Sequence, residues 1–478
     1  MKRIRKLLAF AILGIMAIQA CLAEGETDME LARSYKKQGE NNPLYTQRFG
    51  ADPGVMVYDG RVYVFMTNDI PEYDASGNVK ENSYSQIRSI SLISSDDLVN
   101  WTDHGLIPAA GKNGIARWAN NSWAPCAAHK TVDGEEKFFL YFCNGGNGIG
   151  VLTAPSPTGP WKDELGHALV SRITPNCRDI VWLFDPAVMV DEDGTGYLAF
   201  GGGVPAGKEA APGTARIVRL AEDMLSLDGV PQVIDAPYLF EDSGINRIGD
   251  KYVYSYCSNW QTTGNTLRLT SGAIEYMTAD DPLGPYTYEG ELFPNQGRFF
   301  GLYGNNHHSI ASFGGELLLF YHNRPVEKAM GISGNYRSPQ VDRITVSASG
   351  KMSVKGTMKG ISQIKAFDPF RSVSACEMAR QAGISCDGKQ VTDIDTGDWT
   401  QLCGVDFAAG TKDIRLFAET QEKLVIRMYL DNTAGAPLFE AVFDEEKSEC
   451  VMPAQITGVH DMYFVFEGSG GFIGWEAR

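Results

Sequence analysis

The sequence predicts an all-β protein, a five-bladed β-propeller followed by a jelly-roll-like β-sandwich module. The 478 residues include 52 glycines and 11% aromatic residues, a mixture typical of turn-rich β proteins. A polar anchor, a short apolar run, a glycine-bearing turn and an aromatic-rich strand recur five times in that order. No amphipathic helical pattern of convincing length separates the strands, which argues against a doubly wound α/β fold.

The five repeats begin about 60 residues apart. Each contains an Asp-Gly, Gly-Asp or Gly-Gly turn between two β-rich runs, which indicates a tight hairpin. Second hairpins follow several of these runs, so each repeat is expected to supply four strands. Four-stranded repeats are the blades of a propeller, which we assign to residues 43–365. The anchors of the five repeats are Asp52, Trp123, Asp185, Glu241 and His307.

These anchors are expected to meet in space. In a propeller the innermost strand of each blade lines an axial channel. Because the anchors occupy the same place in each repeat, Asp52, Asp185, Glu241 and His307 should converge at one mouth of that channel. Their convergence is the physical reason for treating residues so far apart in sequence as one site.

After residue 365 the pattern changes to shorter alternating strands. Two examples are Lys423–Leu430 and His460–Phe466. Their turns recur at the spacing of a β-sandwich. Residues 366–478 are therefore predicted to form a separate sandwich module.

The N-terminus has the features of a processing segment. Four basic residues precede the apolar run Leu7–Ala17, which is too short to span a bilayer. Cys21 follows a small residue, as in a bacterial lipoprotein cleavage site, so residues 1–21 are expected to be a signal peptide with Cys21 acylated. An ordinary signal peptidase site nearby is the alternative. Residues 22–42 are polar and predict a linker, in a periplasmic or cell-surface lipoprotein or, alternatively, a secreted protein.

Net charge and cysteine spacing limit which macromolecules and metal ions the chain is expected to bind. The formal net charge is −17, and an acidic chain repels nucleic acid and anionic membranes. We therefore expect no nucleic-acid partner, membrane contact only through a lipid anchor, and a monomer. The eight other cysteines show no CxxC spacing, so no zinc site is indicated. Cys376 and Cys386 are candidates for a disulfide, which the sequence leaves open.

Carboxylates at a channel mouth suit the hydrolysis of a glycosidic bond. One carboxylic acid protonates the leaving oxygen, and a second carboxylate, about 6.5–9.5 Å away, activates water in inverting enzymes. A third carboxylate raises the pKa of the acid by like-charge repulsion. Asp52, Asp185 and Glu241 provide these groups. Taken singly, each also fits an ordinary loop residue, and the tryptophans fit a core; their registration across the repeats favours a site.

These motifs resemble glycoside hydrolase family 43, whose members are five-bladed propellers that invert configuration. The resemblance covers residues 43–365 and is closest to the arabinoxylan arabinofuranohydrolases. It rests on short motifs around each anchor: Gly50-Ala-Asp52-Pro, Trp123-Ala-Pro125, Trp182-Leu-Phe-Asp185-Pro-Ala, Phe240-Glu241-Asp-Ser-Gly and Gly304-Asn-Asn-His307-His-Ser.

The resemblance assigns roles to individual residues. It implies that Asp52 is the general base, that Glu241 is the general acid, and that Asp185 orients Glu241 and tunes its pKa. It implies calcium beside the axial His307. The residues that it implies contact the sugar, or shape its pocket and the flanking xylan groove, are Trp123, Trp182, Trp260, Asn305 and Arg337.

Residues 366–478 resemble carbohydrate-binding module family 6. The opening Glu-Ala-Glu of that family is replaced by Ser374-Ala-Cys376, and Gly474 stands where an Asp is expected. Those family acids hold a structural calcium, so the resemblance implies a module without this ion. The module is then expected to support the propeller more than to bind sugar.

Three functions are compatible with these features. The first is an exo-acting, inverting α-L-arabinofuranosidase that removes branches from arabinoxylan. The second is a β-xylosidase or an arabinan-directed arabinofuranosidase of the same family, because pocket loops decide specificity. The third is a non-catalytic glycan-binding lipoprotein, which the presence of all three acids disfavours.

Overall fold

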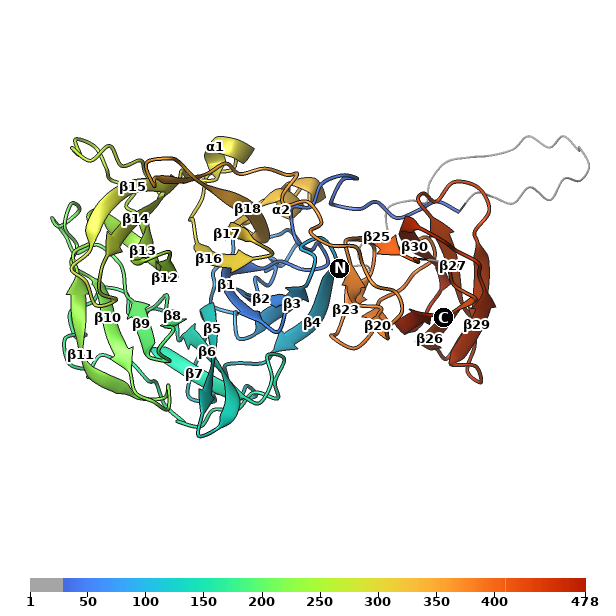
Figure 1. Ribbon diagram of the computed structural model, residues 1–478, viewed down its shortest axis with the longest axis horizontal. Coiled ribbons are helices and arrows are strands. Elements are labelled where there is room, and N and C mark those ends of the chain that lie inside the picture. The colour runs from blue at the N-terminus through green and yellow to red at the C-terminus, as the bar shows by residue number, and fades with distance from the viewer. Residues whose placement is uncertain (1–28, 409) are drawn as a thin grey trace, which may run out of the picture. The chain divides into compact units, whose positions relative to one another are not determined.

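Residues 51–354 form five antiparallel sheets that follow one another around a ring, from blue to yellow-orange in Figure 1. The computed structural model describes residues 29–408 and 410–478. The innermost strands β1, β5, β8, β12 and β16 contact one another in this order, and β16 contacts β1. The predicted five-bladed propeller is therefore confirmed, with its first and last blades in contact.

Blades 1, 3, 4 and 5 each have the four sequential strands predicted for them. Blade 1 comprises β1 (Ala51–Tyr58), β2 (Arg61–Thr67), β3 (Ile90–Ser95) and β4 (Trp101–Ile107). Blade 3 comprises β8 (Ala187–Val190), β9 (Gly196–Phe200), β10 (Ala215–Leu220) and β11 (Leu227–Ile234). Blade 4 comprises β12 (Leu239–Ile248), β13 (Lys251–Ser258), β14 (Ile274–Ala279) and β15 (Thr287–Phe293). Blade 5 comprises β16 (His308–Phe313), β17 (Glu316–Asn323), β18 (Ser338–Val346) and β19 (Met352–Val354).

Blade 2 differs from the prediction of four strands. It has β5 (Trp123–Val132), β6 (Glu135–Cys143) and β7 (Ile149–Ala154). At its outer edge two isolated bridges, between Thr153 and Lys162 and between Ile149 and Val170, take the place of a fourth strand. Two short helices, α1 (Gly297–Phe300) and α2 (Pro325–Met330), precede and follow the first hairpin of blade 5.

Asp-Gly turns form the first hairpins of blades 1 and 2. Asp59 and Gly60, between β1 and β2, have φ of 46° and 71°, and Asp133 and Gly134, between β5 and β6, have φ of 55° and 82°. Two successive positive φ values are what a two-residue type I′ hairpin requires, and Asp-Gly meets that requirement at little cost. Behind the turns, apolar faces of neighbouring blades pack together, as Phe65 and Phe138 do between blades 1 and 2.

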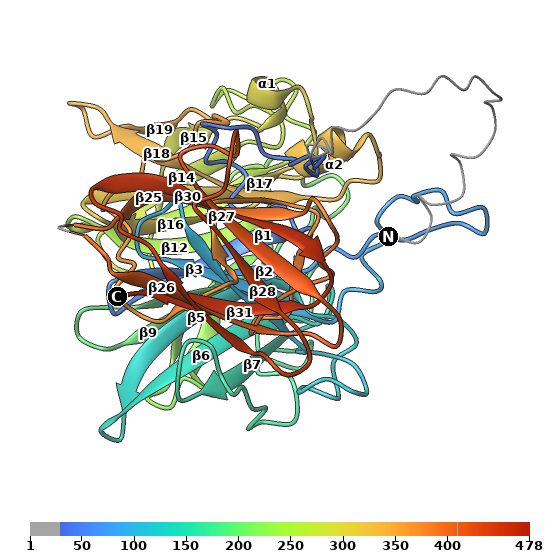
Figure 2. The same ribbon diagram turned by 90° about the vertical axis from the view of Figure 1, so that its right-hand side faces the viewer.

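The C-terminal part is the predicted β-sandwich (Figure 2). One sheet has the order β23-β24-β31-β26-β29, with β20 beside β31, and the other has the order β22-β25-β30-β27-β28. Leu416, Ile426, Phe464 and Trp475 are buried in one core between the sheets. The strands are β20 (Val373–Ser374), β22 (Arg380–Ala382), β23 (Ser385–Cys386), β24 (Val391–Thr392), β25 (Trp399–Asp406), β26 (Asp413–Glu419), β27 (Leu424–Leu430), β28 (Phe439–Phe443), β29 (Glu449–Pro453), β30 (Val459–Gly468) and β31 (Gly471–Ala477).

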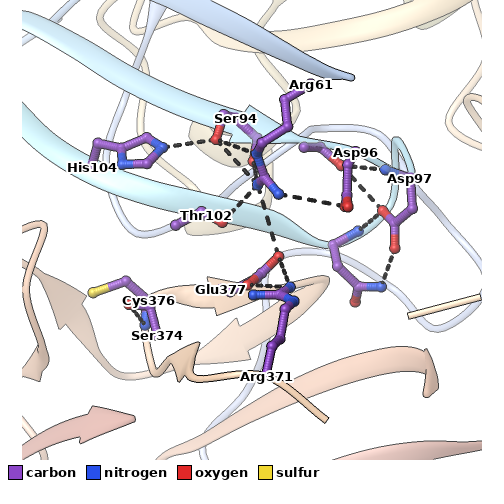
Figure 3. A network of polar contacts seen from close by, with 12 residues as sticks. Arg61, Ser94, Asp96, Asp97, Thr102, His104, Arg371, Ser374, Cys376 and Glu377 are labelled. Carbon is purple, nitrogen blue, oxygen red and sulfur yellow. Dashed lines mark hydrogen bonds and ion pairs between the residues drawn. The ribbon is translucent and has the colours of Figure 1, made fainter. Parts of the chain in front are cut away.

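One strand of the C-terminal part belongs to the propeller. Strand β21 (Glu377–Met378) pairs with β4 and becomes the fifth strand of blade 1. Its buried Glu377 accepts hydrogen bonds from Arg371 at 2.9 and 3.0 Å and lies 3.8 Å from Arg61 of β2 (Figure 3). The two domains are thus joined by a shared sheet and by buried charge.

The segment predicted as a linker is partly a packed strap. Lys36 is buried, and its Nζ donates to the Ala379 carbonyl at 2.9 Å. Asn42 is also buried, and its side chain donates to the carbonyls of Val341 and Thr357. Residues 31–42 therefore contact the sandwich first and blade 5 next, so this part of the polar linker predicted for 22–42 is packed against both domains. The signal peptide predicted at 1–21 lies outside the described residues.

Candidate active site

Asp52, Asp185 and Glu241 come together from blades 1, 3 and 4 around His307. The His307 Nδ1 atom lies 3.7 Å from Asp52 Oδ1 and 3.9 Å from Asp185 Oδ2, and its Nε2 atom lies 3.2 Å from Asp242 Oδ1. Glu241 shares this electrostatic environment, because its pKa responds to both Asp52 and Asp185. The predicted convergence of the anchors at one end of the inner strands is therefore observed.

A repeated backbone distortion positions these acids. Asp52, Ala124 and Asp185, each followed by proline, have φ of 49°, 37° and 48°, and Asp242 has φ of 68°. The pairing register shifts around these residues in β1, β5 and β12. Such bulges redirect side chains at the ends of strands, here toward the axis.

This distortion corrects the predicted equivalence of the anchors. The residues with positive φ occupy equivalent positions in their blades. In blade 2 the residue equivalent to Asp52 and Asp185 is Ala124 and not Trp123, and in blade 4 it is Asp242 and not Glu241. Glu241 therefore directly precedes the residue with positive φ in its blade, whereas Asp52 and Asp185 are themselves the residues with positive φ.

Asp52 is held in its ionised form. The Arg337 Nη1 atom donates to Asp52 Oδ1 at 2.7 Å, and His322 Nδ1 lies 3.3 Å from the same oxygen. Burial alone would raise the pKa of Asp52, but the positive charge of Arg337 and the contacts of His307 and His322 hold that pKa well below its usual range. An ionised buried carboxylate is the state that a general base requires.

The surroundings of Glu241 shift its pKa in the opposite direction. Burial raises its pKa well above the ordinary value, and the nearby charges of Asp185, Asp52 and Asp242 raise it further. One of its carboxyl oxygens, Oε1, is buried with no hydrogen-bond partner among the described residues. These effects favour the protonated carboxylic acid, the form that a general acid requires.

Asp185 lies between these two extremes. Burial raises its pKa to about 7, with His307 opposing the increase and Asp52 and Asp242 adding to it. Its Oδ2 atom accepts the backbone N–H of Asp242 at 3.0 Å. Asp185 is thus attached to the residue that follows Glu241, a position from which its charge acts on Glu241.

A buried hydrogen-bond chain fixes this part of β12. Asp242 Oδ2 lies 2.5 Å from His308 Nδ1, and His308 Nε2 lies 2.6 Å from Ser255 Oγ. A Cβ atom on Gly244 would stand 2.4 Å from that Oγ atom, so only glycine permits the contact. Sequence reasoning missed Asp242 and His308, although each directly follows a predicted site residue.

Two of the residues predicted to contact sugar, Asn305 and Arg337, lie at one pocket. Arg337 is buried and also binds Asp69, through Nε at 2.9 Å and Nη2 at 2.8 Å, so its polar atoms are largely occupied by protein. Asn305 and Arg337 line a pocket of about 120 Å³. The other residues lining it are Tyr84, Gln296, Gly304, His322, Arg324 and Asn335.

The three predicted tryptophans lie in different surroundings. Trp123 donates from Nε1 to the Tyr84 carbonyl at 3.1 Å, so it supports a residue of this pocket. Trp182 packs against Phe240, next to Glu241, with ring centroids 5.1 Å apart. Trp260 is 39% exposed and lines a separate open cleft with Tyr238 and residues 207–211.

The side chains do not fit the calcium site expected at His307. Calcium prefers oxygen ligands, whereas His307 offers ring nitrogens, one facing Asp242 and the other facing Asp52 and Asp185. Within residues 29–408 and 410–478, no group of three or more His, Cys, Asp or Glu is arranged to hold a metal ion.

At one channel mouth, the propeller holds one carboxyl group whose pKa is lowered and another whose pKa is raised, which are the base and the acid that hydrolysis of a glycosidic bond requires. Residues 41–352 match glycosyl hydrolases family 43. The chain is 45% identical over 465 residues to an arabinoxylan arabinofuranohydrolase of Paenibacillus polymyxa, covering 91% of this chain and 73% of the relative. It is 40% identical over 474 residues to one of Bacillus subtilis, covering 91% of each. The chain belongs to glycosyl hydrolases family 43.

Solved structures agree with this assignment. The Bacillus subtilis arabinoxylan arabinofuranohydrolase in complex with cellotetraose matches with a TM-score of 0.89 and 40% identity, over 93% of this chain and 99% of that one. An α-L-arabinofuranosidase of Clostridium thermocellum matches with a TM-score of 0.53 and 37% identity, over 67% of this chain and 98% of that one. The first match extends across the propeller and the sandwich together.

Replacing Asp185 tests the tuning of Glu241. Asp185→Asn removes a negative charge that raises the pKa of Glu241, so Glu241 should lose its proton at lower pH. We expect the alkaline limb of the kcat/KM profile to move to lower pH. Asp193→Asn, in the exposed turn of the same blade, is the control and should leave the limb in place. An unmoved limb in Asp185→Asn contradicts the tuning role.

Replacing His308 tests whether the buried chain positions the acids. His308→Gln loses the ring nitrogen that faces Asp242, and a small displacement of reacting groups lowers kcat by about 10–100-fold. KM should change little, because His308 is not among the pocket residues. Ser309→Ala, one residue along β16, should retain kcat. A rise in KM at unchanged kcat would show that the chain does not position Glu241 and Asp185.

Proposed function

We propose that this protein is an inverting, exo-acting α-L-arabinofuranosidase that removes arabinofuranosyl branches from arabinoxylan. The observation that carries the proposal is that the pKa values of Asp52 and Glu241 are shifted in opposite directions, next to a pocket of about 120 Å³ lined by His322 and Arg337, which contact Asp52. The names of the relatives from Paenibacillus polymyxa and Bacillus subtilis support arabinoxylan as the substrate.

The reaction follows from the charges of the three acids. Glu241 gives its proton to the glycosidic oxygen as the bond to the anomeric carbon breaks. Asp52 takes a proton from a water molecule, which attacks the opposite face of the sugar and inverts the configuration. Arg337 keeps Asp52 ionised and oriented. Asp185 keeps the proton on Glu241 until it is transferred.

Two parts of the substrate are assigned to two places on the protein surface. The pocket of about 120 Å³ lined by Asn305 and Tyr84 suits the arabinose branch. We assign the polysaccharide main chain to the open cleft with Trp260 and Tyr238, since exposed aromatic rings provide stacking faces for sugars. A relative that crystallised with cellotetraose supports a plant oligosaccharide or polysaccharide as the ligand.

Product analysis tests the reaction and the acid together. Incubation with arabinoxylan should release arabinose, detected by NMR first as the β-anomer. Glu241→Ala and Asp52→Ala should each lower turnover by about 10²–10⁴-fold, because general acid–base catalysis contributes that much. Glu241→Ala should retain the melting temperature, whereas Asp52→Ala should lower it, because it leaves the buried Arg337 with one carboxylate partner fewer. Glu275→Gln replaces another buried carboxyl of blade 4, outside the pocket, and should keep its activity.

Other outcomes would change the assignment. Release of xylose from xylo-oligosaccharides, or of arabinose only from arabinan, would keep the family and replace the substrate. Inactivity on all these substrates, with binding retained, would favour the non-catalytic glycan-binding protein.

We also propose that the protein is exported and anchored as a monomeric lipoprotein through Cys21. The basic and apolar run before Cys21 supports export. Within the part of the chain that the structure describes, no helix is both long and apolar enough to cross a bilayer. Labelling with radioactive palmitate should mark the native chain and not Cys21→Ser. An unlabelled native chain whose N-terminus begins after another residue would indicate ordinary signal peptidase cleavage.

A further inference from the structure

Two cysteines of the C-terminal part meet beside strand β4 of the propeller. The backbone carbonyl of Cys376 accepts the N–H of Asp103 at 2.9 Å. Cys386 ends β23, and the carbonyl of the next residue, Asp387, packs against Gly105, where a Cβ atom would stand 2.6 Å away. The two cysteines therefore reach positions two residues apart on β4 from separate turns of the chain.

The two thiols influence each other. Interaction with the Cys376 thiol, together with burial, raises the pKa of Cys386 well above its ordinary value. Cys376 is fully buried and Cys386 is partly buried. Figure 3 shows Cys376 beside Ser374 and Glu377, next to the strand that joins the two domains. Neither thiol is a free surface group.

The same place is where the family 6 resemblance expects calcium-binding acids. Ser374 pairs directly with Gly474 across β20 and β31, so both replaced positions are neighbours and neither side chain is a carboxylate. Among residues 29–408 and 410–478 no cluster of acids or histidines suits a cation. The residues here do not fit calcium, and Cys376 itself stands at one of the replaced acid positions.

We propose that Cys376 and Cys386 form a disulfide in the exported protein, a covalent link that takes the place of a structural cation. Each thiol loses its proton, one S–S bond forms, and the two electrons reduce the disulfide of an export-compartment thiol oxidoreductase to two thiols. The oxidation depends on the proposed export, whereas the proximity of the two cysteines does not. The remaining described cysteines, Cys126, Cys143, Cys177, Cys257, Cys403 and Cys450, stay as thiols.

The link would stabilise the junction of the two domains. Cys376 directly precedes β21, the fifth strand of blade 1, and Cys386 belongs to a strand of the sandwich. A bond between them closes a short loop and limits the freedom of this loop in the unfolded chain. The sandwich edge is thereby tied to the strand that pairs with the propeller.

Peptide mapping tests the disulfide directly. The full-length chain, expressed with its own leader, is denatured in iodoacetamide and cut with trypsin without reductant. Cleavage after Arg371, Arg380 and Lys389 separates the cysteines into peptides 372–380 and 381–389. We expect one linked species with a mass two hydrogens below the sum. Two alkylated peptides contradict the proposal.

A second preparation tests whether the two cysteines can form a disulfide independently of export. The chain without its leader, purified from a reducing cytoplasm, is equilibrated in a glutathione redox buffer and mapped in the same way. Linked peptides here, with alkylated peptides in the first preparation, support the pair and overturn its formation by export. Alkylated peptides in both preparations overturn the disulfide itself. Arabinose release is measured separately, so a wrong substrate assignment does not affect these results.

Thermal unfolding gives a matched control. Cys376→Ser and Cys386→Ser should each melt about 4 °C or more below the parent, and a reductant should lower the melting temperature of the parent but not of these variants. Cys450→Ser changes a buried cysteine of the same sandwich and should keep the response to reductant. A parent that is insensitive to reductant contradicts the proposed stabilisation.

Discussion

The buried guanidinium of Arg337 is the interaction on which the site depends. It comes from the chain just before β18 of the last blade, and it binds Asp52 of β1 and Asp69, which follows β2. One cation therefore joins the fifth blade to the first and compensates two buried carboxylates. An unpaired charge buried between the blades would be costly. The same ion pairs therefore stabilise the contact between the first and fifth blades and the ionised form of Asp52.

Glu241 and Asp185 have no guanidinium partner comparable to that of Asp52, and this difference lets one site hold both an acid and a base. Glu241 and Asp185 are buried near Asp52 without a guanidinium of their own, so desolvation and like charge favour their protonated forms. A single channel mouth thereby holds a base and an acid at one pH. The histidine at the centre, His307, contacts carboxylates from three directions and moderates their repulsion.

Much of this arrangement was predictable, because propeller repeats carry their geometry in the sequence. Asp52, Asp185, Glu241 and His307 were placed together from repeat spacing alone. The one-residue offset of Glu241 was not predicted, since a backbone bulge leaves no compositional signal. Pairing partners far along the chain were also missed, because nothing in the local sequence marks them: Asp69 for Arg337, β21 for β4, and the strap of residues 31–42 for blade 5. Only the folded chain reveals which distant groups share a buried charge or a sheet edge.

The fifth strand of blade 1 has a consequence for solubility. An uncovered outer strand of a blade presents unpaired backbone groups, to which a strand of another chain can attach. Strand β21 occupies the outer edge of β4 through its pairing with Trp101 and Thr102. A propeller separated from its sandwich would expose part of this edge to self-association. Protection from aggregation is thus a reason for the two domains to be inherited as one unit.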